Sequence, residues 1–173
     1  MSLSMYDASV PIFVRGLNSL SGLMDKSLAE GFDETALMQA RLADDMRPFP
    51  DQVRMACFSP RGAVARLAGI DWPKTSDDET DFAQLKATIQ LSIDFLNGIT
   101  PEQLEGSEAR EIVLTLPAFE LTFTGAGYLT SFALPNFYFH LTTAYAILRN
   151  QGVPLGKRDF LGELALTRPP VMG

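Results

Sequence analysis

Apolar residues recur at spacings of three and four along the first part of the chain, which is the pattern of amphipathic helices. They predict a first helix over about residues 5–30, in which Pro11 either kinks the helix or moves its start to a cap at Ser9. A short helix over about 33–39 should follow. A second long helix is expected between Pro48 and Gly69, because proline favours the first turn of a helix and glycine favours its end.

A polar loop over residues 72–81 precedes the third long helix. Ser76, Asp77 or Asp78 is expected to cap that helix, because short polar side chains accept hydrogen bonds from the free N–H groups of the first turn. The apolar stripe that follows ends at Asn97-Gly98, where the glycine predicts the end of the helix.

The pattern changes once, before the last helix. β-Branched and aromatic residues dominate 111–116 and 120–124, and these segments predict a short β-hairpin. The last long helix is expected over about 126–150 with a kink at Pro135. An irregular tail through 157–160 should complete the chain.

Four long amphipathic helices, with a hairpin between the third and the fourth, predict an all-α fold of the four-helix-bundle type in one domain, 1–173. The net charge of −7 argues against nucleic acid and anionic membranes as partners. No stretch has the apolar length of a membrane helix, and the N-terminus lacks the pattern of a signal peptide. The single cysteine, Cys57, cannot form an internal disulfide, so we expect a cytoplasmic protein.

The most distinctive chemistry lies in the last helix. The only histidine, His140, follows Asn136 by one helical turn, and Pro135 beside the pair cannot donate a backbone hydrogen bond. A buried amide or imidazole without a partner costs about 1–3 kcal/mol, so these groups need partners. Asn136, His140 and Tyr145 either satisfy one another or a buried water inside the core, or they face a ligand.

Three strings in the sequence carry a family resemblance: Ala40-Arg-Leu-Ala-Asp-Asp-Met46, Leu134-Pro-Asn-Phe-Tyr-Phe-His140 and Tyr145-Ala-Ile-Leu-Arg-Asn-Gln-Gly-Val153. Together with the order of the helices and the hairpin, they resemble an uncharacterised bacterial family within the DinB/YfiT-like superfamily of four-helix candidate metalloenzymes. The resemblance extends over nearly the whole chain. It implies a DinB-like helical bundle and a homodimer.

Active members of that superfamily hold a divalent metal on three histidines, one on the second helix and a His-x-x-x-His pair on the last. Here the resemblance places Asn136 and His140 at the pair, and Cys57 near the expected position on the second helix. Asparagine is a poor ligand for Zn²⁺ or Ni²⁺, and a thiol must lose its proton to bind a metal. We therefore expect no metal and no other cofactor.

The sequence thus predicts a DinB-like bundle with a degenerate metal site at Cys57, Asn136, His140 and Tyr145, acting as an interaction module for a small molecule or a protein. Antiparallel packing of the second and last helices, about 8–10 Å apart, should gather the first three around one cavity. The alternative is a thiol-dependent transferase or hydrolase, in which Cys57 and His140 form a thiolate–imidazole pair. That enzyme needs a thiol that reaches solvent and has a lowered pKa. No residue identifies a ligand or a substrate.

Overall fold

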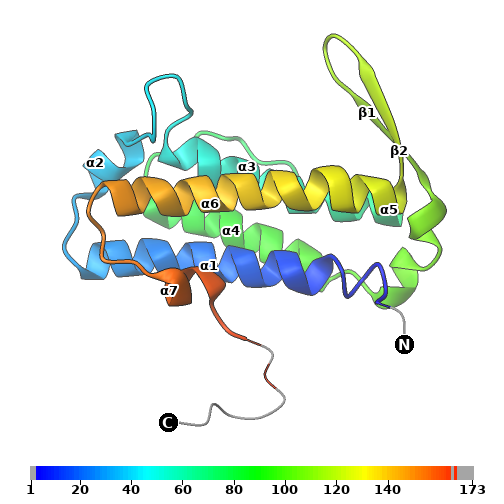
Figure 1. The fold of residues 1–173 in the computed structure, drawn as a ribbon, viewed down its shortest axis with the longest axis horizontal. Coiled ribbons are helices and arrows are strands. Elements are labelled where there is room, and N and C mark those ends of the chain that lie inside the picture. Colours follow the sequence, from blue (N-terminus) through cyan, green and yellow to red (C-terminus); the bar gives the residue numbers. More distant parts are fainter. Residues whose placement is uncertain (1–2, 165, 167–173) are drawn as a thin grey trace.

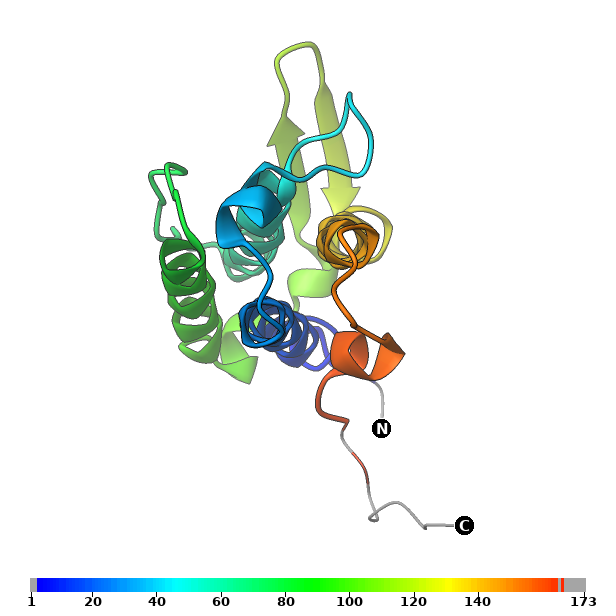
Figure 2. The same cartoon turned by 90° about the vertical axis from the view of Figure 1, so that its left-hand side faces the viewer.

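The computed structural model describes residues 3–164 and 166, and long helices dominate it (Figure 1). The long helices are α1 (Val10–Ala29), α3 (Phe49–Ala68), α4 (Phe82–Asn97) and α6 (Leu134–Asn150). Figure 2 views them nearly end-on and shows that they surround one common core. None of the helices in the described residues has the length and apolar character needed to cross a bilayer.

Short elements connect or extend the long helices. They are α2 (Glu34–Gln39), two 3₁₀ turns (Pro101–Leu104 and Ser107–Ala109), β1 (Glu111–Thr115), β2 (Glu120–Thr124), α5 (Gly125–Tyr128), a π-helical turn (Leu129–Ala133) and α7 (Lys157–Leu161). The predicted hairpin is confirmed, because β1 and β2 pair antiparallel with Glu111 opposite Thr124. The prediction of four helices holds only for the long ones, since α2, α5 and α7 add three short helices in the described residues.

Two sequence predictions about helix ends were wrong. The N-terminal cap of α4 is Asp81, whose carboxylate accepts a hydrogen bond from the Gln84 N–H at 2.8 Å, and not Ser76, Asp77 or Asp78. The segment 157–160, predicted as irregular, belongs to α7. An Asp side chain in the first turn of α7 stabilises this short helix, because it accepts a hydrogen bond from the backbone N–H of Gly156.

Of the two starts predicted for the first helix, the structure shows the later one, with Ser9 at the cap position and no kink at Pro11. The helix begins at Val10, with Ser9 at the cap position and Pro11 in the first turn, where its missing N–H breaks no helical hydrogen bond. The Ser9 hydroxyl donates to the Met5 carbonyl at 2.6 Å instead of capping the helix. Gly69 adopts a left-handed conformation and ends α3.

The core has contributions from all four long helices, and one part of it lies where α1 approaches α6. Phe137 is completely buried, and its ring meets the Phe13 ring edge-on with centroids 5.1 Å apart. A Cβ atom at Gly16 would lie 2.6 Å from the Phe137 ring, so glycine is required for this close approach. Leu141, one turn further along α6, is also buried. This face of α6 therefore packs into the bundle, and its neighbouring face is directed toward α3.

Candidate functional site

Two hydrogen-bonded pairs join α3 to α6 across the otherwise apolar core. His140 Nδ1 lies 2.9 Å from Gln52 Oε1, and Asn136 Nδ2 donates to Ser59 Oγ at 3.2 Å. The earlier residue on α3 pairs with the later residue on α6, which shows that the two helices run antiparallel. We call these four residues the α3–α6 seam. The two residues predicted on the last helix thus face a common partner helix.

The backbone opens beside the seam, as expected from Pro135. The five residues before Leu134 form a π-helical turn, in which the Leu134 N–H donates to the carbonyl of Leu129, five residues back. The Ser59 hydroxyl also lies 3.5 Å from the carbonyl oxygen of Ala133, at the end of that turn. A wide turn accommodates the ring of Pro135 without the clash that a regular α-helix would suffer. π-Turns occur often at binding and catalytic sites.

His140 is a neutral hydrogen-bond donor in this arrangement. Gln52 Nε2 donates to the Arg47 carbonyl at 3.0 Å, which turns Gln52 Oε1 toward the imidazole. Nδ1 of His140 therefore carries the proton, and Nε2 carries the lone pair. Burial, together with the positive charge of Arg47, lowers the pKa of His140 below its usual value. The imidazole is accordingly uncharged at neutral pH, and it satisfies the buried amide of Gln52.

Cys57 and Tyr145 lie outside the seam. Gln52 and Ser59 are seven residues, or about two helical turns, apart, so they lie on the same face of α3. Cys57 follows Gln52 by five residues, which places it about 140° away around the helix axis. Its thiol is completely buried and interacts with Ser92 of α4. Burial raises the pKa of Cys57 to about 12. The Tyr145 ring instead packs edge-on against Phe160 of α7, with centroids 5.5 Å apart.

The sequence interpretation missed Gln52 and Ser59, the two α3 partners of the seam. The signal that could have found them is their two-turn spacing, which places two polar side chains on one face of a buried helix. Sequence reasoning expected Asn136, His140 and Tyr145 to satisfy one another or a buried water, whereas Asn136 and His140 pair with Ser59 and Gln52 of α3.

A cavity of about 500 Å³ opens beside the Asn136–Ser59 pair, between α3, the hairpin and the π-turn. Its walls are largely apolar, and they are formed mainly by Met55, Phe58, Leu114, Leu116, Tyr128 and Phe132. The polar residues that line it include Asn136, Ser59 and Arg66.

Arg66 marks one end of this cavity with a positive charge. Its guanidinium donates to the Tyr128 hydroxyl at 3.4 Å and lies over the Trp72 ring, 4.8 Å from the centroid. Trp72 in turn packs against Phe58, with ring centroids 6.4 Å apart. Aromatic faces hold a guanidinium in place while leaving its charge available to a ligand.

The seam residues do not fit a three-histidine metal centre of the kind that the sequence resemblance attributes to active members of the superfamily. Within the described part of the chain, no three His, Cys, Asp or Glu side chains gather in a way that would hold a metal ion. The seam contains one imidazole, two side-chain amides and one hydroxyl. The imidazole Nδ1 and both amides already take part in hydrogen bonds, either across the two helices or to the Arg47 carbonyl just before α3. Neutral amides and hydroxyls suit hydrogen bonding to an organic ligand better than binding Zn²⁺.

Comparisons with known proteins place the chain in an uncharacterised DinB-like family. Residues 5–161 match the family model described as a domain of unknown function, DUF1993, and the chain belongs to that family. A crystal structure described as a DinB family member from Shewanella denitrificans is 34% identical, with a TM-score of 0.87 over 95% of this chain and 96% of that one. The resemblance found in the sequence is thereby confirmed. No curated protein matches the chain.

Proposed function

We propose that this DUF1993 protein is a binding module for a small apolar molecule carrying an oxygen acceptor, a carbonyl or a carboxylate, held in the cavity between α3, the hairpin and the π-turn. The observation that carries the proposal is the Asn136–Ser59 pair in the wall of an otherwise apolar cavity of about 500 Å³. Small-molecule sites usually have about 300–1,000 Å³ and combine apolar walls with a few placed polar groups.

The polar groups at the cavity explain why the ligand should carry an oxygen acceptor. Asn136 Nδ2 has two N–H groups, and one of them is used by Ser59 Oγ. Asn136 and Arg66 both line the cavity, so the second N–H and the guanidinium are the donors available to a ligand there. The rest of the wall is largely apolar, so these donors are the groups that would orient a ligand. A carboxylate or carbonyl on an apolar body complements this arrangement.

The alternative thiol-dependent enzyme has less support. A nucleophilic cysteine needs solvent access and a lowered pKa, whereas the Cys57 thiol is buried and its pKa is raised. The homodimer implied by the superfamily remains part of the proposal. Phe119 in the hairpin turn and Phe139 on α6 are each more than half exposed and offer apolar surface that a second copy would cover.

A fluorescence titration tests the proposed ligand class. Trp72 is the only tryptophan and lies on Arg66, so its emission reports on the cavity. We expect 4-phenylbutyrate to change the emission saturably. The substitution Asn136→Leu should raise the dissociation constant about three- to tenfold, because it removes one hydrogen bond. Asn150→Leu at the exposed end of α6 is the matched control and should leave the affinity unchanged. Equal affinities in both variants, or no saturable change with the wild type, would refute the proposal.

A further inference from the structure

Arg66 is the only charged residue among the described residues that line the cavity beside the Asn136–Ser59 pair. The ion pairs in the described part of the chain all join other side chains, so no carboxylate there compensates this guanidinium. A guanidinium is always charged and has five N–H donors. Its one hydrogen-bond partner among the described residues is the Tyr128 hydroxyl, at 3.4 Å. Arg66 therefore brings a positive charge and unused donors to the cavity wall.

The guanidinium of Arg66 is held in place by its surroundings. The side chain folds back by one turn along α3, and a Cβ atom at Gly62 would lie only 2.6 Å from its Nη1. Glycine at position 62 thus leaves the space that the guanidinium occupies. The Trp72 ring packs against the same group, with its centroid 4.8 Å from Cζ. A donor that is already held loses little conformational freedom when it binds a ligand.

Tyr128 adds a second donor next to the guanidinium. The residue lines the cavity and is only 2% exposed. Its oxygen accepts the hydrogen bond from Arg66, so its own O–H can still donate, and no described residue accepts it. Burial raises the pKa of Tyr128 above its usual value, so the phenol keeps this proton at neutral pH. Two donors, one of them charged, therefore meet at one place in the wall.

The Asn136 amide lies close to this pair of donors. Gly62, against which the guanidinium lies, follows Ser59 by three residues, so their Cβ positions are neighbours on one face of α3, about 5–6 Å apart. Ser59 Oγ in turn accepts the hydrogen bond from Asn136 Nδ2 at 3.2 Å. Donors separated by about one helical turn match a headgroup with two acceptor oxygens better than a single carbonyl oxygen.

We propose that the ligand of this cavity is a monocarboxylate, that Arg66 and Tyr128 recognise its charge, and that Gly62 and Trp72 position Arg66. The inference rests on the function proposed above, because it names the class of ligand for the same cavity. The apolar body of the ligand lies against the largely apolar remainder of the wall. A second carboxylate would find no further basic residue among the described residues that line the cavity, so the ligand carries one.

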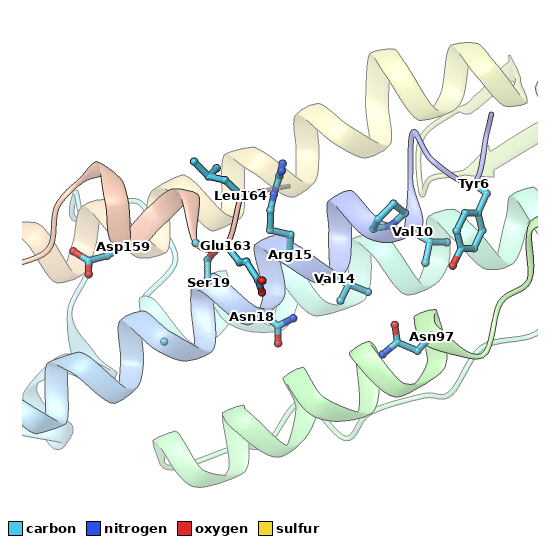
Figure 3. A pocket seen from close by; sticks show the side chains of 13 residues that line it. Tyr6, Val10, Val14, Arg15, Asn18, Ser19, Asn97, Asp159, Glu163 and Leu164 are labelled. Atoms are coloured by element: carbon cyan, nitrogen blue, oxygen red, sulfur yellow. The ribbon is translucent and has the colours of Figure 1, made fainter. Parts of the chain in front are cut away.

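A larger cavity, of about 850 Å³, lies along α1 and shares no lining residue with this one. Figure 3 shows its lining side chains, among them Arg15, Asp159 and Glu163. Acidic residues line that cavity together with a basic one, whereas Arg66 is the only charged residue lining the first. The cavity along α1 therefore supplies control positions, Arg15 and Gly22, at which a change should not affect the proposed recognition.

Three probes of nearly the same shape test the proposal: 4-phenylbutyrate, 4-phenylbutyramide and 4-phenylbutylammonium. Isothermal titration calorimetry of the full chain near neutral pH should give a dissociation constant for the carboxylate at least about tenfold below that for the amide, because hydrogen bonds to a charged group are stronger. The ammonium should bind most weakly, since it carries the same charge as Arg66. Added NaCl should weaken the carboxylate and leave the amide unchanged.

Removing the charge of Arg66 should remove the preference for the carboxylate. In Arg66→Met, we expect the two dissociation constants to differ by less than about twofold, because the amide never used the charge. Arg15→Met takes the same charge from the other cavity and should leave the tenfold preference intact. The preference is a ratio of two affinities in one variant, so a general loss of stability does not mimic its change.

Gly62→Ala tests the positioning of Arg66 with the charge retained. The added methyl group displaces the far end of a flexible side chain, and alanine favours a helix, so the protein should stay folded. We expect the carboxylate preference to fall about threefold or more. Gly22→Ala is the matched control, since a Cβ atom there meets nothing within 4 Å. Tyr128→Phe should weaken the carboxylate about three- to tenfold, because it removes only the hydroxyl.

The outcomes separate this inference from the proposed function. Equal affinity for carboxylate and amide in the wild type, with both weakened by Asn136→Leu, would overturn the inference and leave the proposed function standing. No saturable binding of any probe would overturn both. A preference that survives Arg66→Met and is lost in Arg15→Met would place the carboxylate in the cavity along α1 and overturn both for this ligand. An unchanged preference in Gly62→Ala would overturn the positioning of Arg66.

Discussion

Replacing Phe137 with alanine is expected to lower the free energy of unfolding by about 3–5 kcal/mol. The ring is fully buried between α1 and α6, where it contacts Phe13 and lies over the bare backbone of Gly16. Removing it loses both the transfer free energy of an aromatic ring and the edge-to-face contact, and it leaves a cavity that two rigid helices cannot close. The effect is large because one ring fixes the distance between these helices.

Denaturant unfolding followed by circular dichroism measures this loss. Thr142→Ala is the matched control, since Thr142 lies five residues further along α6 and is exposed. We expect its free energy of unfolding to change by less than about 1 kcal/mol. An unchanged unfolding midpoint in Phe137→Ala would mean that the faces of α6 are assigned wrongly.

The thiol of Cys57 is expected to be almost inert in the folded protein. Burial raises its pKa from 9.0 to about 12, with Ser92 and Arg61 offsetting part of the effect, so the thiolate fraction near neutral pH falls by about a thousandfold. Closed access to the buried sulfur slows the reaction further. Labelling with a maleimide should therefore require unfolding, and the labelling rate should rise steeply in denaturant. Rapid labelling of native protein below pH 7 would instead support the thiol-dependent enzyme.

The same pKa shift predicts how stability depends on pH. The folded protein holds the Cys57 proton more tightly than the unfolded chain, so this contribution to stability is complete below pH 9 and is lost as the pH rises toward 12. The variant Cys57→Ala lacks this contribution. The difference in stability between wild type and Cys57→Ala should therefore shrink with increasing pH in that range and stay constant below it.

Most of the fold could be predicted from the sequence, because local signals and core burial agree. The apolar stripe of α1, the proline in its first turn and the glycine that ends α3 all act within a few residues. The cap of α4 could not be chosen from local signals, since several acidic and polar side chains precede the helix. Distant residues decide the choice: Glu79 is held by Arg54 at 2.7 Å and by Thr88, which leaves Asp81 beside the first turn.

Only the residues that α6 contributes to the candidate site could be predicted from the sequence, and their partners on α3 could not. Asn136 and His140 were evident because polar side chains are rare on that face of the last helix. Their partners depend on the rotation of α3 about its axis, which the sequence pattern leaves open because almost the whole of that helix is buried. Polar residues at a two-turn spacing, and not the only cysteine, proved to face α6. A rotation of α3 by about 140° about its axis thus separates a thiol site from an amide site.

The central claim is that the α3–α6 seam is a hydrogen-bonded structure without a bound metal, whose Asn136–Ser59 pair takes part in recognising a ligand. Elemental analysis of protein purified without chelators tests it most directly, with His140→Ala measured in parallel. The account predicts Zn, Ni and Fe contents far below one per chain in both proteins, because Gln52 and Ser59 occupy the positions facing His140 and Asn136. About one equivalent of metal per chain in the wild type, lost in His140→Ala, would contradict it.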